Sequence, residues 1–224
     1  MNEMPEKIWL KLSPQKIWLS EWCSYKCVFC YNGRKQFKEF PIPEIKYNHI
    51  QILDPAFLSK KDVIGVIKEL GLKKVKGKVV YYELVQGINW KDLTQDIANE
   101  LKKNRFIKIR LAWDRGYNRY YMFKIYDCKN MLIKAGYKPK DLAIFMLVNW
   151  LVPYKECLAK LDLLKIWGVR VADCCYNGGY HIKSEIDYNN NQNPRNWNYQ
   201  QLKNFRHICR KHNQILRGID PELK

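Results

Sequence analysis

The sequence predicts an α/β fold in which parallel strands alternate with helices along the chain. Short apolar, β-branched segments typical of buried strands alternate with segments of helical periodicity. Successive strand-like segments begin 29, 28, 35 and 27 residues apart, which is about the length of one strand–helix unit. These segments are residues 50–53, 79–84, 107–112, 142–148 and 169–172.

A further strand is expected before this series. Residues 7–10 and 16–19 both read Lys-Ile-Trp-Leu, and a turn-forming Ser-Pro-Gln lies between the two copies. We interpret them as a strand, a turn and a second strand, because two copies of four residues do not make a repeat architecture. The second copy is the natural first strand of the parallel series, which then has six strands joined by five crossover helices.

Apolar residues recur at helical spacing between the strands. The longest helix is expected over residues 120–135, because Gly136 and then Pro139 follow it. Residues 177–198 are rich in Asn and Gly and predict a long loop, after which a basic helix covers about residues 199–213. The shorter helices are marked by Val63, Ile67 and Leu70, by Leu93, Ile97 and Leu101, and by Leu158, Leu161 and Lys165 beside Leu164.

The chain of 224 residues suits one domain with a full core. We expect residues 1–176 to form this core and residues 177–224 to extend it. No segment approaches the roughly 20 apolar residues of a membrane span, and the N-terminus lacks the apolar centre of a signal peptide. We therefore expect a cytoplasmic protein without a membrane partner, whose cysteines stay reduced.

Lysine and arginine outnumber aspartate and glutamate by 40 to 22, which gives a formal net charge of +18. Such a charge favours polyanionic partners and accelerates their encounter with the protein. A lysine-rich, solvated surface explains the same charge equally well.

Three cysteines, Cys23, Cys27 and Cys30, lie in one short run with the spacing C-x3-C-x2-C. Three thiolates on one loop can hold three irons of a cubane [4Fe–4S] cluster and leave the fourth iron open to another ligand. A structural zinc site needs four ligands, usually in two pairs, and this run supplies three. The spacing therefore favours an iron–sulfur cluster.

This run, with Phe29 directly before the third cysteine, resembles the cluster loop of the radical S-adenosylmethionine (radical SAM) enzymes. The resemblance implies a partial (β/α)6 barrel of the TIM type, with the cluster loop after the first strand. It also implies that the open iron binds SAM and that the reduced cluster cleaves SAM to a 5′-deoxyadenosyl radical. That radical would abstract hydrogen from a substrate, and an RNA or a peptide is consistent with the charge. The electrons would come from a flavodoxin-like or ferredoxin-like donor.

Polar residues at the ends of the expected strands are the candidates for SAM contacts, because ligands bind at the carboxyl ends of parallel strands. The resemblance assigns Phe29 to the adenine, and Asp54, Glu83, Arg110 and Asn149 to the polar groups of SAM. Each of these four also suits a helix cap, a turn or a structural pair. Where the family often has Gly-Gly-Glu, residues 53–57 of this chain read Leu-Asp-Pro-Ala-Phe.

Two alternatives remain open at this point. Cys174 and Cys175 follow the sixth strand and could ligate an auxiliary cluster or supply a reactive thiol. The cysteine run could instead bind structural zinc, with Cys174 or Cys175 as a fourth ligand, in a non-enzymatic module whose basic surface binds nucleic acid. The metal content of the protein distinguishes the zinc module from the enzyme.

Overall fold

The computed structural model describes residues 14–25, 27, 29–30, 36–175 and 197–219. The chain divides into two compact units, residues 1–109 and residues 110–224. Each unit contains a parallel sheet with helices packed against it. The expected strand at residues 7–10, and all but the last two residues of the expected loop at 177–198, lie outside the described residues. The expected boundary at residue 176 remains a prediction.

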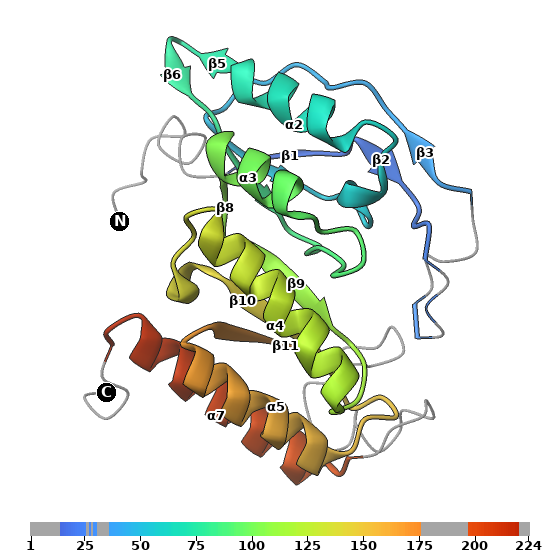
Figure 1. Ribbon diagram of the computed structural model, residues 1–224, viewed down its shortest axis with the longest axis vertical. Helices are drawn as coiled ribbons and strands as arrows, with labels where there is room; N and C mark the ends of the chain where they lie inside the picture. The colour runs from blue at the N-terminus through green and yellow to red at the C-terminus, as the bar shows by residue number, and fades with distance from the viewer. Residues whose placement is uncertain (1–13, 26, 28, 31–35, 176–196, 220–224) are drawn as a thin grey trace, which may run out of the picture. The chain divides into compact units, whose positions relative to one another are not determined.

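The first unit is built on a four-stranded sheet in the order β1-β4-β7-β8, with every pairing parallel (Figure 1). Side chains alternate along β4, so that Ile50 and Ile52 are fully buried. The strands are β1 (Gln15–Ile17), β4 (His49–Ile52), β7 (Tyr81–Leu84) and β8 (Phe106–Ile107), and the helices are η1 (Phe57–Ser59), α2 (Val63–Leu72) and α3 (Gln95–Lys103).

Two small antiparallel pairs accompany this sheet. Strand β2 (Ser20–Glu21) pairs with β3 (Lys38–Glu39), and β5 (Lys74–Val75) pairs with β6 (Lys78–Val79). The expected strand at residues 79–84 is therefore shorter in the structure, because exposed Val79 belongs to the hairpin and β7 begins at Tyr81. Sequence patterns did not predict either antiparallel pair.

The second unit contains a three-stranded parallel sheet in the order β11-β10-β9. Helix α5 contacts β10 and β11, and α7 packs against α5 and β11. Its elements are β9 (Arg110–Trp113), α4 (Arg119–Lys134), η2 (Pro139–Asp141), β10 (Ala143–Val148), α5 (Tyr154–Trp167), β11 (Arg170–Cys175) and α7 (Tyr199–Leu216).

The expected strand at residues 107–112 is two strands in the structure. Strand β8 ends at Ile107 and pairs with β7, whereas β9 begins at Arg110 and pairs with β10. Lys108 between them has a φ of +52°, a left-handed conformation that interrupts an extended strand. The expectation of one strand was wrong because lysine, unlike glycine, gives no sequence signal for this conformation.

The remaining expectations agree with the structure at the level of elements. Helices α2, α3, α4, α5 and α7 lie where the periodicity placed them, and the strands of the four-stranded and the three-stranded sheet pair in parallel. Strand β11 extends to Cys175, so the expected end at residue 172 was too early. In the described part of the chain, no helix is long and apolar enough to cross a membrane.

Candidate iron–sulfur loop and its supports

The cysteine run belongs to the first unit and follows β1 and β2. Trp22, the residue before Cys23, has a φ of +62°, which turns the chain out of the strand. A tight turn closes the far end of the loop, where the Cys30 N–H donates to the Cys27 carbonyl at 3.0 Å. All three cysteines are half-buried and reduced. Three thiols therefore lie on one loop at the end of the first parallel strand.

A hydrogen-bond network ties this loop to two other loops of the same unit. The Tyr25 hydroxyl donates to Asp92 Oδ1, and the Ser59 hydroxyl donates to Asp92 Oδ2 at 3.0 Å. The Ser24 hydroxyl in turn donates to Ser59 Oγ at 2.9 Å. Burial raises the pKa of Tyr25, and its bond to Asp92 raises it further, so the hydroxyl stays a donor at neutral pH. Asp92 is thus the acceptor that fixes the middle of the cysteine loop.

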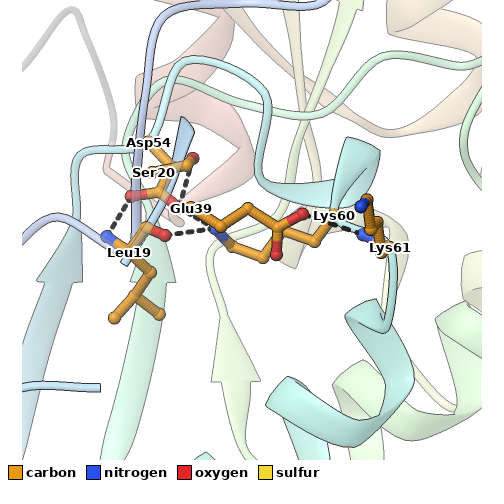
Figure 2. A network of polar contacts seen from close by, with 6 residues as sticks. All are labelled: Leu19, Ser20, Glu39, Asp54, Lys60 and Lys61. Carbon is orange, nitrogen blue, oxygen red and sulfur yellow. Dashed lines mark hydrogen bonds and ion pairs between the residues drawn. The ribbon is translucent and has the colours of Figure 1, made fainter. Parts of the chain in front are cut away.

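A second network holds the chain just before the loop (Figure 2). Asp54 accepts from the Leu19 N–H at 2.6 Å and from the Ser20 hydroxyl at 2.8 Å. Lys60 Nζ lies 3.0 Å from Asp54 Oδ2 and donates to the Leu19 carbonyl at 2.6 Å. Both charged side chains are 1% exposed or less. The predicted SAM contact Asp54 is therefore engaged by three donors that join the β1–β2 segment to the segment after β4.

Figure 2 also shows an outer contact beside this network. The Glu39 carboxylate of β3 accepts from the backbone N–H of Lys61 at 3.1 Å. Lys61 directly follows buried Lys60, so this bond attaches the β3 strand to the same turn. Residues 19–20, 39, 54 and 60–61 together form one support, which we call the Asp54 network.

Glu83, another predicted SAM contact, lies on β7 and is 2% exposed. Its Oε2 is 3.2 Å from Lys108 Nζ and 3.5 Å from His49 Nε2. The structure places Glu83 in the sheet next to β4, where it forms an ion pair with Lys108 and lies near the imidazole of His49.

The other two predicted SAM contacts, Arg110 and Asn149, belong to the second unit. Arg110 is the first residue of β9, and its guanidinium lies 5.9 Å from the centre of the Phe145 ring. Asn149 directly follows β10, is buried, and has a φ of +63°. Its side chain hydrogen-bonds with Cys175 at the end of β11. Asn149 thus lies at the carboxyl ends of two parallel strands, as the sequence predicted.

The thiols of Cys174 and Cys175 lie at the same end of β11. Burial raises the pKa of Cys174 to about 12 and that of Cys175 to about 11, so both are protonated at neutral pH. Asp173 beside them pairs with Arg206 of α7 at 3.2 Å. Within the described ranges, no group of three or more His, Cys, Asp and Glu side chains lies close enough to hold a metal ion.

Sequence reasoning missed the residues that support the loop. Tyr25, Ser59, Lys60 and Asp92 carry no motif, and each acts through a partner at least 33 residues away in the chain. Ser59 and Asp92 follow the second and third expected strands, which is where functional loops of parallel α/β folds gather. Their position after these expected strands was the sequence signal that could have identified Ser59 and Asp92.

Comparisons with known proteins show the fold. No protein-family model and no curated protein matches the chain. Among solved structures, the radical S-adenosylmethionine methyltransferase TsrM from Kitasatospora setae, with cobalamin and a [4Fe-4S] cluster bound, matches with a TM-score of 0.58 and 9% identity. HydG, a maturase of the [FeFe]-hydrogenase, matches with a TM-score of 0.58 and 16% identity.

The matches cover 72% and 89% of this chain, and 36% and 49% of TsrM and HydG respectively. The chain therefore spans about a third and about half the length of these two structures. The chain has an α/β fold like theirs. This confirms the predicted fold class of parallel strands with a C-terminal helix. The chain also resembles the folds of these two solved structures.

The side chains of the loop are of the chemical type that binds iron–sulfur clusters. Thiolates are the ligands that iron–sulfur clusters use, and the three here are half-buried rather than sealed in the core. Burial raises the pKa of Cys23, and the nearby Cys30 contributes to the same rise. Neither the fold nor the comparisons support the alternative of a zinc module.

Proposed function

We propose that this protein is a radical SAM enzyme. The observation that carries the proposal is the position of the C-x3-C-x2-C loop, which follows the first parallel strand β1 and the short strand β2 in a fold similar to that of a radical SAM methyltransferase. Cys23, Cys27 and Cys30 would hold a [4Fe–4S] cluster. When bound with SAM, such a cluster supplies a 5′-deoxyadenosyl radical that removes hydrogen from substrate.

The protein's own residues would orient the loop and receive SAM. Tyr25 and Ser24 hold the loop through Asp92 and Ser59. Asp54 already accepts from three donors, so we propose that it acts mainly by fixing the chain before Cys23. The proposed contacts to SAM are Phe29 for the adenine, and Glu83, Arg110 and Asn149 for its polar groups.

The test begins with protein purified without oxygen. About four irons and four sulfides per chain, with an absorption band at about 400 nm, are expected in the wild type and are expected to be lost in Cys27→Ala. Cys128→Ala is the matched control, because Cys128 is buried in α4 and belongs to no proposed ligand set. With SAM and a reductant, the wild type and Cys128→Ala should form 5′-deoxyadenosine. Stoichiometric zinc without colour, or a reduced cluster that forms no 5′-deoxyadenosine, would contradict the proposal.

The partners follow from the same proposal. A low-potential one-electron donor of the flavodoxin or ferredoxin type would reduce the cluster, and the protein would act in the cytoplasm. The net charge of +18 supports a polyanionic substrate such as RNA, and a peptide is the second candidate.

A further inference from the structure

Helix α4 presents a row of aromatic rings to solvent. Tyr120, Phe123 and Tyr126 are 57%, 49% and 39% exposed, and they follow one another at a spacing of three residues. The buried residues of the same helix, Ile125, Cys128 and Leu132, lie on its other side. Every exposed large apolar side chain of α4 is aromatic. Rings exposed together in this way indicate an interaction surface rather than a core face.

Basic side chains lie over these rings. Lys124 Nζ is 5.8 Å from the centre of the Tyr120 ring, and Lys129 Nζ is 4.5 Å from the centre of the Tyr126 ring. Residues 115–140 contain seven Lys and Arg residues and one acidic residue, Asp127. Three cations, Arg119, Lys124 and Lys129, accompany the rings, and exposed Asp127 is the acidic residue of the same helix segment. We call this surface the α4 face: Arg119, Tyr120, Phe123, Lys124, Tyr126 and Lys129.

The α4 face rests on a rigid aromatic base within the second unit. The Tyr126 ring lies 5.5 Å from Trp167 of α5, and Trp167 stacks on buried Trp113 at 6.2 Å with an angle of 12°. Lys129 Nζ is also 5.7 Å from the Trp167 ring. At least one ring of the face is thus held in place before any partner arrives, which lowers the entropy cost of binding.

We propose that the α4 face binds single-stranded nucleic acid. Aromatic rings stack on bases of any sequence, and lysines and arginines beside them pair with the phosphates. A membrane surface fits less well, because the exposed part of α4 offers no aliphatic side chain to insert among acyl chains. This inference does not depend on the proposed cluster chemistry.

The test measures binding of a fluorescein-labelled 20-nucleotide RNA of mixed sequence to the full chain by fluorescence anisotropy. In the double variant Tyr120→Ala/Phe123→Ala, we expect at least about tenfold weaker binding, because two stacking rings are lost. In Arg119→Gln/Lys124→Gln, we expect weaker binding and a salt dependence reduced by about two phosphate contacts. A single-stranded DNA of the same sequence should bind in the same way, because stacking does not require the 2′-hydroxyl.

Matched controls remove similar side chains elsewhere. Tyr81→Ala removes an exposed ring from β7, and Lys203→Gln/Arg217→Gln removes two exposed charges near α7. Both should bind RNA within about twofold of the wild type. The proposal is overturned if the ring variant binds as tightly as the wild type, if the two charge variants weaken binding equally, or if no RNA binds at 50 mM salt. It is also overturned if the ring variant loses binding to anionic phosphatidylserine vesicles while its RNA binding is unchanged.

Discussion

Lys60 is a buried lysine whose ammonium group is satisfied by one carboxylate and one backbone carbonyl. Removal of one member of such a pair leaves the other charge buried without a partner, which typically costs about 3–5 kcal/mol. We therefore expect Lys60→Met to lower the free energy of unfolding by about this amount, measured by urea denaturation. The neighbouring Lys61→Met should change it by less than about 0.5 kcal/mol, since the Lys61 side chain is exposed and its bond to Glu39 uses the backbone. Equal effects in the two variants would refute the structural role of the Asp54 network.

Asp92 is a second single residue with a structural role, because it holds the cysteine loop itself. Asp92→Ala removes the acceptor of both Tyr25 and Ser59, so the loop between Cys23 and Cys27 loses its fixed conformation. We expect the iron content after anaerobic reconstitution to fall severalfold, while the thermal midpoint changes little because the network is half-exposed. Exposed Asp96→Ala in the first turn of α3 is the control and should reconstitute like the wild type. Full iron incorporation in Asp92→Ala would show that the loop needs no such support.

Asp114 follows β9, and burial raises the pKa of its carboxyl group from the ordinary 3.8 to about 6. A carboxyl group with a raised pKa binds its proton more tightly in the folded state, so its ionisation opposes folding above pH 6. Asp114→Asn should therefore be more stable than the wild type at pH 7.5, by up to about 3 kcal/mol. The difference should shrink as the pH falls from 6 to 3.8 and should vanish at about pH 3, where the wild-type carboxyl group is protonated in both states. Urea denaturation across this range checks the sign, with exposed Asp127→Asn as the control; a difference that grows towards low pH would contradict the assignment.

At the scale of elements, α7 covers the open edge of the second sheet. Strand β11 pairs with β10 on one side, and on its other side the Asn213 amide accepts from the Val171 N–H at 2.9 Å and donates to the Val171 carbonyl at 2.7 Å. His212 Nε2 lies 2.8 Å from the Val169 carbonyl beside it. One side chain thus takes the place that a neighbouring strand would occupy, and protects an edge that could pair with another molecule.

This pairing predicts the effect of one substitution. Asn213→Leu keeps the apolar contacts of α7 but leaves two backbone groups of β11 without partners, at a cost of about 2–4 kcal/mol. We expect a lower urea midpoint and more light scattering on warming, because the edge becomes available to other chains. Asn204→Leu on the same helix is the control; its side chain is exposed and its amide donates to the Tyr154 hydroxyl. If the two variants behave alike, α7 does not protect the edge.

The elements themselves were largely predictable from the sequence, because apolar periodicity reports directly on burial. The break between β8 and β9 was not, since Lys108 is held in its left-handed conformation by strand pairing on both sides and by its ion pair with Glu83, a partner 25 residues away. The hairpin of β5 and β6 was missed for a similar reason. Its two strands have two residues each and bury little apolar surface, so they leave no periodic pattern.

At the scale of the whole molecule, the motif and the fold class could be predicted, whereas the partners of the motif could not. The cysteine spacing is local and lies within eight residues, from Cys23 to Cys30. The supports at Asp54 and Asp92 join positions between 33 and 67 residues apart, and only the folded chain brings them together. The role of Asp54 shows the difference: its position after the second strand was predicted, but its three donors were not.

The two supports of the cysteine loop affect how the protein would respond to loss of its proposed cluster in oxygen. Both supports consist of side chains and backbone groups of the chain itself, and neither uses a thiol of the proposed cluster ligands. Loss of the proposed cluster to oxygen would then leave the first unit folded, with its three thiols still on a tethered loop. Repair would require delivery of iron and sulfide and closure of the three thiols around them, because in the described residues these thiols do not lie close enough together to hold a metal ion. It would not require the unit to refold. Loss of the cluster to oxygen would therefore be reversible.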